Sequence, residues 1–313
     1  MRILSLIVLS TLTLCATAVE AKAPKSKAKP GPLVLSGDNR IVLTVNGKPQ
    51  QFQVDPGHPG TYVVNPSVQS QANLKPTGLI KFGFAHAIGP IRLTFRSGGA
   101  MIGYGAKSEK RRVLWSDRLI AADSDGVVGP NALPNPIVTF VLGPQVTGEK
   151  DVALPLDITG IFGYAGAATL LRVGDVEMPV RFSLLREENL ITAPTGSLLA
   201  NSNQGTLSGG VTSMPIRFGV ARPTRVMKLA TPLLLGGRPI SQISVRVSDF
   251  GDALSIPDEN AEGVDRDEII VTAKSKRKPR YELLLGRSFL AGCSSLTYDF
   301  PAKLIRLRCV NPG

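Results

Sequence analysis

Short apolar stretches separated by turn residues dominate this chain. The stretch "RIVLTVNGKPQQFQVD" (Arg40 to Asp55) alternates apolar and polar residues on both sides of "NGKP", a pattern typical of a tight β-hairpin. Other apolar stretches are rich in Val, Ile, Leu and Thr, and 32 glycines and 24 prolines interrupt them. We therefore predict an all-β fold with few short helices.

Two stretches far apart in the sequence repeat the same order of features. "DGVVGPNALPNPIVTFVLG" (125–143) and "ELLLGRSFLAGCSSLTYDF" (282–300) each contain an apolar run, a glycine, a leucine four residues after it within a short helical turn, and a strand. Such repetition favours a duplicated β-lobe over a short-period repeat. We predict lobe one at residues 37–145 and lobe two at residues 151–313.

The first hairpin also has a counterpart in the second half. Aligning "NGKPQQFQVDPGHPGTYVVNPSVQS" with "GDVEMPVRFSLLREENLITAPTGSLLA" places Phe52 on Phe182 and Asp55 on Leu185. This alignment predicts that the acidic residue in the turn after the first hairpin has no acidic equivalent in lobe two.

The N-terminal segment is not expected to belong to the fold. Arg2 precedes the apolar run "ILSLIVLSTLTLCATA", and the small-residue cleavage pattern "VEA" follows, ending at Ala21. This is typical of a secretory signal peptide over residues 1–21, too short for a membrane span. The alternative is a lipoprotein anchored at Cys15, which is less favoured because Leu14 stands where a small residue is expected. We predict a periplasmic or secreted protein with no transmembrane span.

The chain is basic, with a formal net charge of +12 at pH 7. Its basic residues cluster in "KAPKSKAK", "KSEKRR" and "KSKRKPR". The first cluster lies in a predicted flexible linker (22–36), and the last ends a charged, flexible insertion predicted at residues 252–280. No aromatic stacking motif accompanies these clusters, so we expect an anionic envelope surface or acidic peptides as partners rather than nucleic acid.

Two cysteines remain after signal cleavage, Cys293 and Cys309. Between them, "SSLTYDFPAKLIRLR" has the pattern of two short strands around Pro301, the midpoint of the two cysteines. A hairpin that turns at Pro301 brings the thiols together, and an oxidising compartment favours their oxidation. We predict a structural disulfide that closes the last hairpin.

The stretch "VDPG" after the first hairpin, followed by "GVVG" and "LLLG" at matching places downstream, resembles the retropepsin and pepsin aspartic-peptidase superfamily. In that family each lobe carries D-T/S-G followed by a hydrophobic–hydrophobic–glycine element. The resemblance implies two pepsin/retropepsin-like β-barrel lobes with a cleft between them. It also implies a substrate-covering hairpin, for which "RSGGAMIGYGAK" (96–107) is the candidate, with a plain surface hairpin as an equally good alternative. It suggests a catalytic remnant at Asp55 and Gly57, and cleft residues at Pro56, His58, Tyr104 and Leu185.

The chemistry of the family needs two carboxylates so close that they share one proton. Lobe one supplies Asp55, whereas Leu185 can neither hold nor share a proton. Pro56 lacks the hydroxyl that, in the family, joins the hydrogen bonds between the two loops, and it has no amide donor. Without a neighbouring carboxylate, Asp55 should titrate at about 3.9 unless burial raises its pKa. Three other acids are weaker candidates because they lie outside the matching position: Glu187, Glu188 and Asp157.

These observations predict a secreted, catalytically degenerate relative of aspartic peptidases that binds an extended peptide or a cell-envelope partner between its lobes. Two alternatives stay open. One is an active aspartic endopeptidase that combines Asp55 with an unconventional second acid, and the other is an envelope adaptor that acts through the strand-like part of the 252–280 insertion. No cofactor or metal is expected, since His58 and His86 stand in no metal-ligand spacing with Cys, Asp or Glu.

Overall fold

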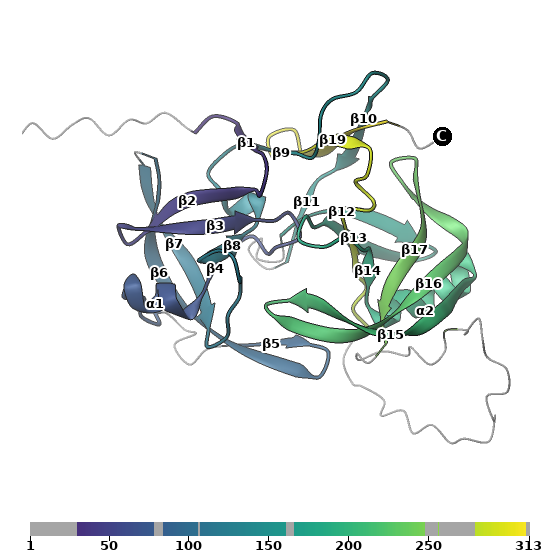
Figure 1. The fold of residues 1–313 in the computed structure, drawn as a ribbon, viewed down its shortest axis with the longest axis horizontal. Helices are drawn as coiled ribbons and strands as arrows, with labels where there is room; N and C mark the ends of the chain where they lie inside the picture. Colours follow the sequence, from purple (N-terminus) through teal and green to yellow (C-terminus); the bar gives the residue numbers. More distant parts are fainter. Residues whose placement is uncertain are drawn as a thin grey trace, which may run out of the picture.

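The structure is a computed structural model that describes residues 30–77, 84–105, 107–160, 166–247, 256 and 279–310. The predicted signal peptide, residues 22–29 of the predicted linker and nearly all of the 252–280 insertion lie outside the described residues. The described chain is mostly β-structure and forms two lobes joined by a shared sheet (Figure 1). None of its described helices is long and apolar enough to cross a membrane.

Lobe one is a β-barrel. Its elements are β2 (Arg40–Val45), β3 (Lys48–Val54), β4 (Tyr62–Val64), α1 (Pro66–Gln71), β5 (Phe84–Ile88), β6 (Ile91–Tyr104), β7 (Lys107–Ser116) and β8 (Gly126–Val128). The strands pair in the order β2-β3-β8-β4-β7-β6-β5, and an additional pairing of β2 with β6 closes six of them into a barrel. The predicted first hairpin is β2 and β3, whose turn at Asn46 and Gly47 has positive φ angles of 50° and 80°, as tight hairpins require.

Lobe two repeats the strand order of lobe one. Its elements are β11 (Asp157–Thr159), β12 (Gly166–Val173), β13 (Val176–Phe182), β14 (Leu190–Ile191), α2 (Ala193–Asn203), β15 (Gly205–Arg217), β16 (Val220–Leu235), β17 (Arg238–Arg246) and β18 (Leu283–Leu285). After β11, the order is β12-β13-β18-β14-β17-β16-β15. Each of these strands holds the same place in the order as its counterpart in lobe one. The parallel pairs recur as well, β13–β18 for β3–β8 and β14–β17 for β4–β7. The predicted barrel is confirmed for lobe one, whereas the described strands of lobe two form an eight-stranded sheet without a pairing that closes it.

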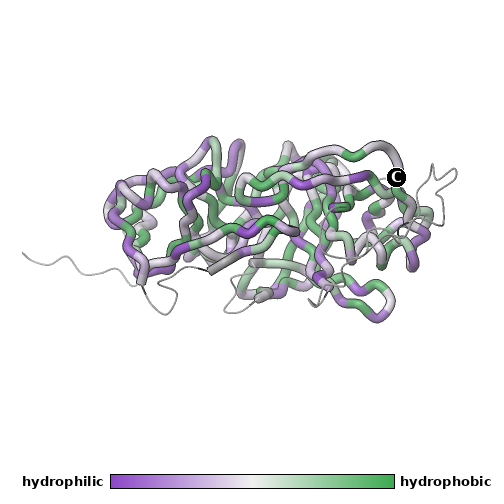
Figure 2. Tube along the Cα trace, turned by 90° about the horizontal axis from the view of Figure 1, so that it is seen from below, coloured by the Kyte–Doolittle hydropathy of each residue, from purple (hydrophilic) through white to green (hydrophobic). Residues whose placement is uncertain are grey.

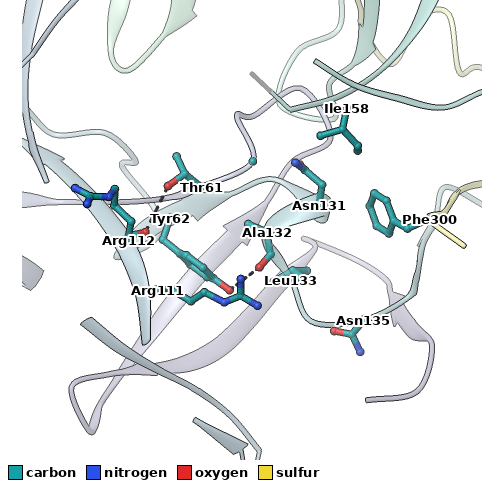
Figure 3. A pocket seen from close by; sticks show the side chains of 11 residues that line it. Thr61, Tyr62, Arg111, Arg112, Asn131, Ala132, Leu133, Asn135, Ile158 and Phe300 are labelled. Carbon is teal, nitrogen blue, oxygen red and sulfur yellow. Dashed lines mark hydrogen bonds between the residues drawn. The ribbon is translucent and has the colours of Figure 1, made fainter. Parts of the chain in front are cut away.

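A third sheet lies between the lobes. It contains β1 (Leu33–Leu35), β9 (Ile137–Val141), β10 (Lys150–Pro155), β19 (Cys293–Asp299) and β20 (Leu304–Cys309), paired in the order β1-β9-β19-β20-β10. Because β9 follows lobe one and β19 follows lobe two, their antiparallel pairing joins the lobes through backbone hydrogen bonds. The predicted disulfide between Cys293 and Cys309 is present and links β19 to β20. The 3-10 helix η1 (Pro130–Ala132) precedes β9, and a cavity lies between it and Phe300 (Figure 3).

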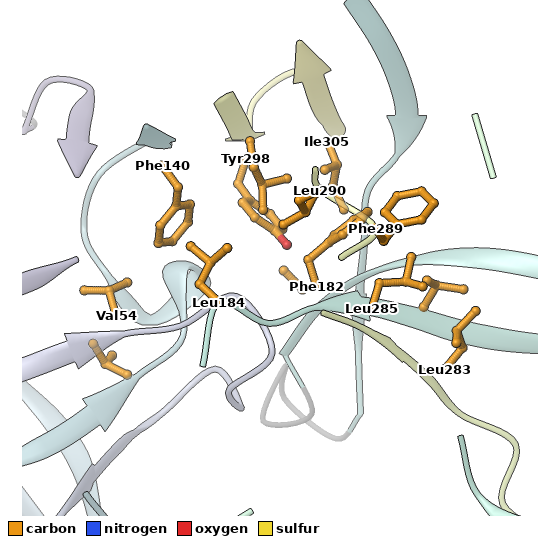
Figure 4. Packing of buried hydrophobic residues seen from close by; sticks show 14 of the residues in the cluster. Val54, Phe140, Phe182, Leu184, Leu283, Leu285, Phe289, Leu290, Tyr298 and Ile305 are labelled. Carbon is orange, nitrogen blue, oxygen red and sulfur yellow. The ribbon is translucent and has the colours of Figure 1, made fainter. Parts of the chain in front are cut away.

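The apolar core runs through both lobes and the shared sheet. Hydrophobic and hydrophilic residues follow one another in short stretches along the chain in Figure 2, as expected for strands that bury one side. The largest cluster of buried side chains includes Val54 of lobe one, Phe182 and Leu285 of lobe two, and Phe140 and Tyr298 of the shared sheet (Figure 4). This packing holds the turn after β3 against the turn after β13.

Candidate functional site

The turn after β3 carries Asp55, and backbone hydrogen bonds identify its equivalent in lobe two. The Asp55 N–H donates to the carbonyl of Val128 in β8 at 3.1 Å, and the Ser183 N–H donates to the carbonyl of Leu285 in β18 at 2.8 Å. Since β3–β8 and β13–β18 are counterpart pairs, Ser183 holds the position of Asp55 in lobe two.

This geometry corrects the predicted alignment, which placed Leu185 on Asp55. Leu185 lies two residues further along and is 56% exposed. A shift by two residues preserves the alternation of inward and outward side chains along a strand, so the hydrophobic pattern could not detect the error. The last buried residue of each strand, Val54 in β3 and Phe182 in β13, gives the correct register.

The Asp55 carboxyl group is buried where the two turns meet. One oxygen accepts the N–H of Leu184 at 2.7 Å, and the Ser183 hydroxyl donates to the two carboxyl oxygens at 3.2 and 3.1 Å. Within the described part of the chain, no carboxylate is hydrogen-bonded to Asp55. A hydroxyl group therefore occupies the place that a second acid would need.

The three other acids considered from the sequence lie on the surface. Glu187 pairs with Arg287 at 3.1 Å, and both side chains are largely exposed. Glu188 is exposed as well, and exposed Asp157 lies opposite Ala168 at the start of β11. None of these acids therefore forms a buried pair with Asp55.

Burial changes the acidity of Asp55. It raises the pKa from 3.8 to about 6, although the Leu184 N–H, the Ser183 hydroxyl and the charges of Arg186 and Arg217 lower it. The carboxyl group is therefore neutral in acidic solution and ionised above about pH 6. A buried carboxyl group with a raised pKa between two lobes marks this turn as the candidate site.

Gly57 allows the two turns to touch. A Cβ atom at this position would lie 2.9 Å from Cβ of Ser183 and 3.0 Å from Oδ2 of Asp55, well inside the usual separation of about 3.5–4.0 Å between carbon atoms. Pro56 is buried beside it and offers neither a hydroxyl nor an N–H. The hydrogen bonds between the turns run instead from Ser183 and Leu184 to Asp55.

The tip of the β15–β16 hairpin of lobe two covers the Asp55 turn. The Arg217 guanidinium donates to the Gly57 carbonyl at 3.2 Å. The next residue, Phe218, is buried and meets the rings of His58 and Phe95 edge-on, with centroids 5.6 and 5.0 Å apart. It belongs to a small hydrophobic cluster otherwise formed mainly by lobe one. The β15–β16 hairpin thus occupies the Gly57 carbonyl and the face of the site at His58, two groups that would otherwise be open to a ligand.

Phe218 adopts a backbone conformation that an aromatic residue disfavours. Its φ of 54° and the φ of 68° at Gly219 are both left-handed, as expected for a two-residue turn between the paired residues Arg217 and Val220. Asn, Asp or Gly usually holds the first of these positions, and for other L-residues the left-handed conformation costs about 1–2 kcal/mol. The contacts of Phe218 with lobe one explain why a phenylalanine stands there.

His58 is an uncharged, buried ring beneath this hairpin. Burial lowers its pKa to about 3, and the positive charge of Arg217 acts in the same direction. Its Nδ1 lies 3.1 Å from the Pro59 carbonyl, to which a protonated Nδ1 donates. In the described structure its Nε2 has no hydrogen-bond partner. At neutral pH, His58 therefore packs against Phe218 as a neutral ring.

A buried ion cluster supports Arg217. The Glu282 carboxylate lies 2.5 Å from Arg181, 3.6 Å from Arg280 and 3.8 Å from Arg217. Burial by itself would raise the pKa of Glu282, but these guanidinium groups and Arg246 lower it to about 2. Glu282 therefore stays ionised and holds Arg217 toward the turn of lobe one.

Tyr104 lies in the predicted hairpin, which β6 and β7 form, but none of its described contacts reaches the Asp55 turn. It ends β6 and lines a small cavity with Tyr62 and Lys107, and β6 and β7 form part of the barrel wall. The hairpin that covers the Asp55 turn is β15–β16. Ser183, Arg217 and Phe218 were not predicted from the sequence as site residues. An aromatic residue before Gly219 in a tight turn is unusual, and this feature could have indicated that Phe218 packs against another part of the protein.

Some solved structures are similar to this chain over about 30% of its length. No protein-family model and no curated protein matches the sequence. Among solved structures, the EIAV protease in complex with an inhibitor matches with a TM-score of 0.23 and 16% identity, covering 30% of this chain and 82% of that one. The retroviral protease-like domain of Ddi1 from Leishmania major matches with a TM-score of 0.21 and 14% identity, covering 29% of this chain and 71% of that one.

Proposed function

We propose that this protein is a catalytically degenerate, retropepsin-like binding protein that holds an extended peptide between its lobes without cleaving it. The observation that carries the proposal is the contact of the Asp55 carboxyl group with the Ser183 hydroxyl across the two turns. The signal-peptide pattern of residues 1–21 supports a periplasmic or secreted location.

The chemistry of this contact argues against peptide hydrolysis. An aspartic peptidase uses one ionised and one protonated carboxyl group, which act on water and on the substrate carbonyl. Here Asp55 is protonated below about pH 6 and ionised above it. Ser183 cannot take the other role, because an aliphatic hydroxyl neither shares a proton with a carboxylate in that way nor acts as a base near neutral pH.

The binding role is supported by the contact between Arg217 and Gly57. The Gly57 carbonyl accepts a hydrogen bond from the Arg217 guanidinium, and a peptide in extended conformation offers backbone N–H groups of the same kind. A peptide that took this carbonyl would displace Arg217 and lift Phe218 from His58. Peptide binding would then be coupled to opening of the β15–β16 hairpin.

The test has a cleavage part and a binding part. For cleavage, the chain without residues 1–21 and its Asp55→Asn variant are incubated with an unfolded protein substrate from about pH 3 to about pH 7, which spans both protonation states of Asp55. We expect no cleavage that depends on Asp55. Cleavage by the wild type that is lost in Asp55→Asn would overturn the degenerate assignment.

For binding, fluorescence anisotropy with a pool of labelled synthetic hexapeptides compares the wild type with Phe218→Ala. Because the variant weakens the closed hairpin, we expect it to bind the pool more tightly. Leu234→Ala, at a residue that is 61% exposed on β16, is the control and should bind as the wild type does. If no hexapeptide binds, or if Phe218→Ala leaves the affinity unchanged, the proposed peptide site is wrong whatever the cleavage assay shows.

One observation favours a second candidate, an active aspartic endopeptidase. The pKa of Asp55 is raised to about 6 by burial, as in carboxylic acids that donate protons in catalysis. The same cleavage assay distinguishes the two candidates. The adaptor hypothesis concerns residues 252–280, nearly all outside the described residues, and stays a prediction that deletion of residues 257–278 would test.

A further inference from the structure

A cavity beside the shared sheet has the size of a small-molecule site. Its volume is about 460 Å³, and it lies between β4, η1, β11 and the turn after β19 (Figure 3). Pockets that hold small ligands commonly measure about 300–1,000 Å³. The cavity is distinct from the contact between Asp55 and Ser183, and the inference drawn from it does not depend on the proposed function.

The edge of the cavity presents a buried hydrogen-bond acceptor. Asn135 lines the cavity and is only 5% exposed. Its Nδ2 donates to the Gly31 carbonyl at 2.8 Å, which fixes the orientation of the amide. Its Oδ1 has no hydrogen-bond partner within the described structure. Since buried polar atoms are rarely left without partners, this oxygen points to a ligand that supplies an N–H or O–H group.

The charge of the cavity favours an anion. Arg111 lines it beside Tyr62, and no Asp or Glu is among the lining residues that the structure describes. The Tyr62 hydroxyl already donates to the Ala132 carbonyl at 2.9 Å, so it needs no ligand. Glu109 pairs with Arg111 at 2.7 Å, but both side chains are about half exposed, and exposed pairs of this kind exchange partners readily because they are weak.

The remaining walls are apolar and include Leu133, Ile158 and Phe300. An anion, an N–H donor and an apolar group occur together in the last residue of a polypeptide. We propose that this cavity binds the C-terminal residue of a peptide. Its carboxylate would pair with Arg111, its amide N–H would donate to Asn135 Oδ1, and its side chain would pack between Ile158 and Phe300.

The experiment uses small probes that each lack one of these groups. The chain without residues 1–21 is titrated calorimetrically with N-acetyl-alanyl-leucine, with its C-terminal amide, with the analogue methylated on the leucine nitrogen, and with decanoate. We expect the free acid to bind at least about tenfold more tightly than the other three, a difference of about 1.4 kcal/mol. An amide, N-methyl analogue or decanoate that binds as tightly as the free acid would overturn the proposal, as would no binding of the free acid up to about 5 mM.

Two variants with matched controls locate the binding. Arg111→Gln should weaken binding of the free acid at least about fivefold, whereas Arg306→Gln should not, although both side chains are similarly exposed (46% and 45%) and each pairs with a carboxylate. Ile158→Glu should abolish binding by placing a negative charge in the cavity, whereas Val141→Glu should not; these residues are 41% and 40% exposed, so neither change should prevent folding. Equal effects of a variant and its control would place the binding elsewhere and refute the site.

Discussion

Replacement of Asp55 by asparagine should change the pH dependence of folding stability. Burial raises the pKa of Asp55 from 3.8 to about 6, so the folded protein holds this proton more tightly than the unfolded chain. Protonation of Asp55 therefore stabilises the folded state. This contribution is fully present below pH 3.8, decreases as the pH rises, and is lost above about pH 6. The difference between the two pKa values corresponds to about 3 kcal/mol. Asparagine has no charge to bury, so the variant should show no such loss from this position.

The assay is equilibrium unfolding in guanidinium chloride at about pH 4 and about pH 8, which lie on either side of the folded pKa. The measured quantity is the free energy of unfolding of Asp55→Asn minus that of the wild type. Other titrating groups contribute equally to both proteins and cancel in this difference. We expect the difference to become more positive by about 2.5 kcal/mol at the higher pH, less than the full value of about 3 kcal/mol because pH 4 already lies just above 3.8. A constant offset from the altered hydrogen bond to Leu184 does not change this expectation.

Two results would refute this reasoning. A difference that is the same at both pH values would mean that Asp55 titrates alike in the folded and unfolded states, and therefore is not desolvated. A difference that becomes more negative at the higher pH would mean that the ionised carboxylate is stabilised. The Leu184 N–H and the charges of Arg186 and Arg217 would then outweigh burial.

Three further substitutions test the packing around the site. Gly57→Ala should lower the free energy of unfolding, measured in guanidinium chloride, by about 1–3 kcal/mol. Gly210→Ala, whose Cβ would meet no atom within 4 Å, should leave it unchanged, and equal effects of the two changes would contradict the close contact of the turns. Glu282→Gln should lower the free energy of unfolding by about 3–5 kcal/mol because it leaves buried guanidinium groups without their anion. The control Glu187→Gln, at a side chain that is 59% rather than 14% exposed, should lower it by less than about 1 kcal/mol. A loss of less than about 1 kcal/mol for Glu282→Gln would show that the ion cluster is not desolvated. Phe218→Ala should speed amide hydrogen exchange in the β15–β16 tip and in the turn after β3, and unchanged exchange would mean that the aromatic contacts do not hold the hairpin closed.

The local elements of the fold could be predicted from the sequence. The alternation on both sides of "NGKP" predicted the β2–β3 hairpin, and the cysteine spacing around Pro301 predicted the disulfide-linked β19–β20 hairpin. Both features are encoded within a few neighbouring residues. The closing of lobe one by the pairing of β2 with β6 joins residues far apart in the chain, and a hydrophobic pattern contains no information on such a pairing.

Of the candidate site, only the part in lobe one could be predicted from the sequence. The "VDPG" stretch identified the turn that carries Asp55, but the position of its partner depended on strand register, and alternation is unchanged by a slip of two residues. Arg217 and Phe218 were missed because their role arises from contact between the lobes. The raised pKa of Asp55 likewise depends on burial by residues distant in sequence.

The position of the β19–β20 hairpin has a consequence for biogenesis. These strands follow both lobes in the chain, yet they insert between β9 and β10 at the centre of the shared sheet. Until residue 309 has been synthesised, the edge of β9 that pairs with β19 in the folded protein has no partner in the shared sheet. During synthesis there is therefore a period in which a chaperone, or another copy of the chain, can pair with that edge of β9.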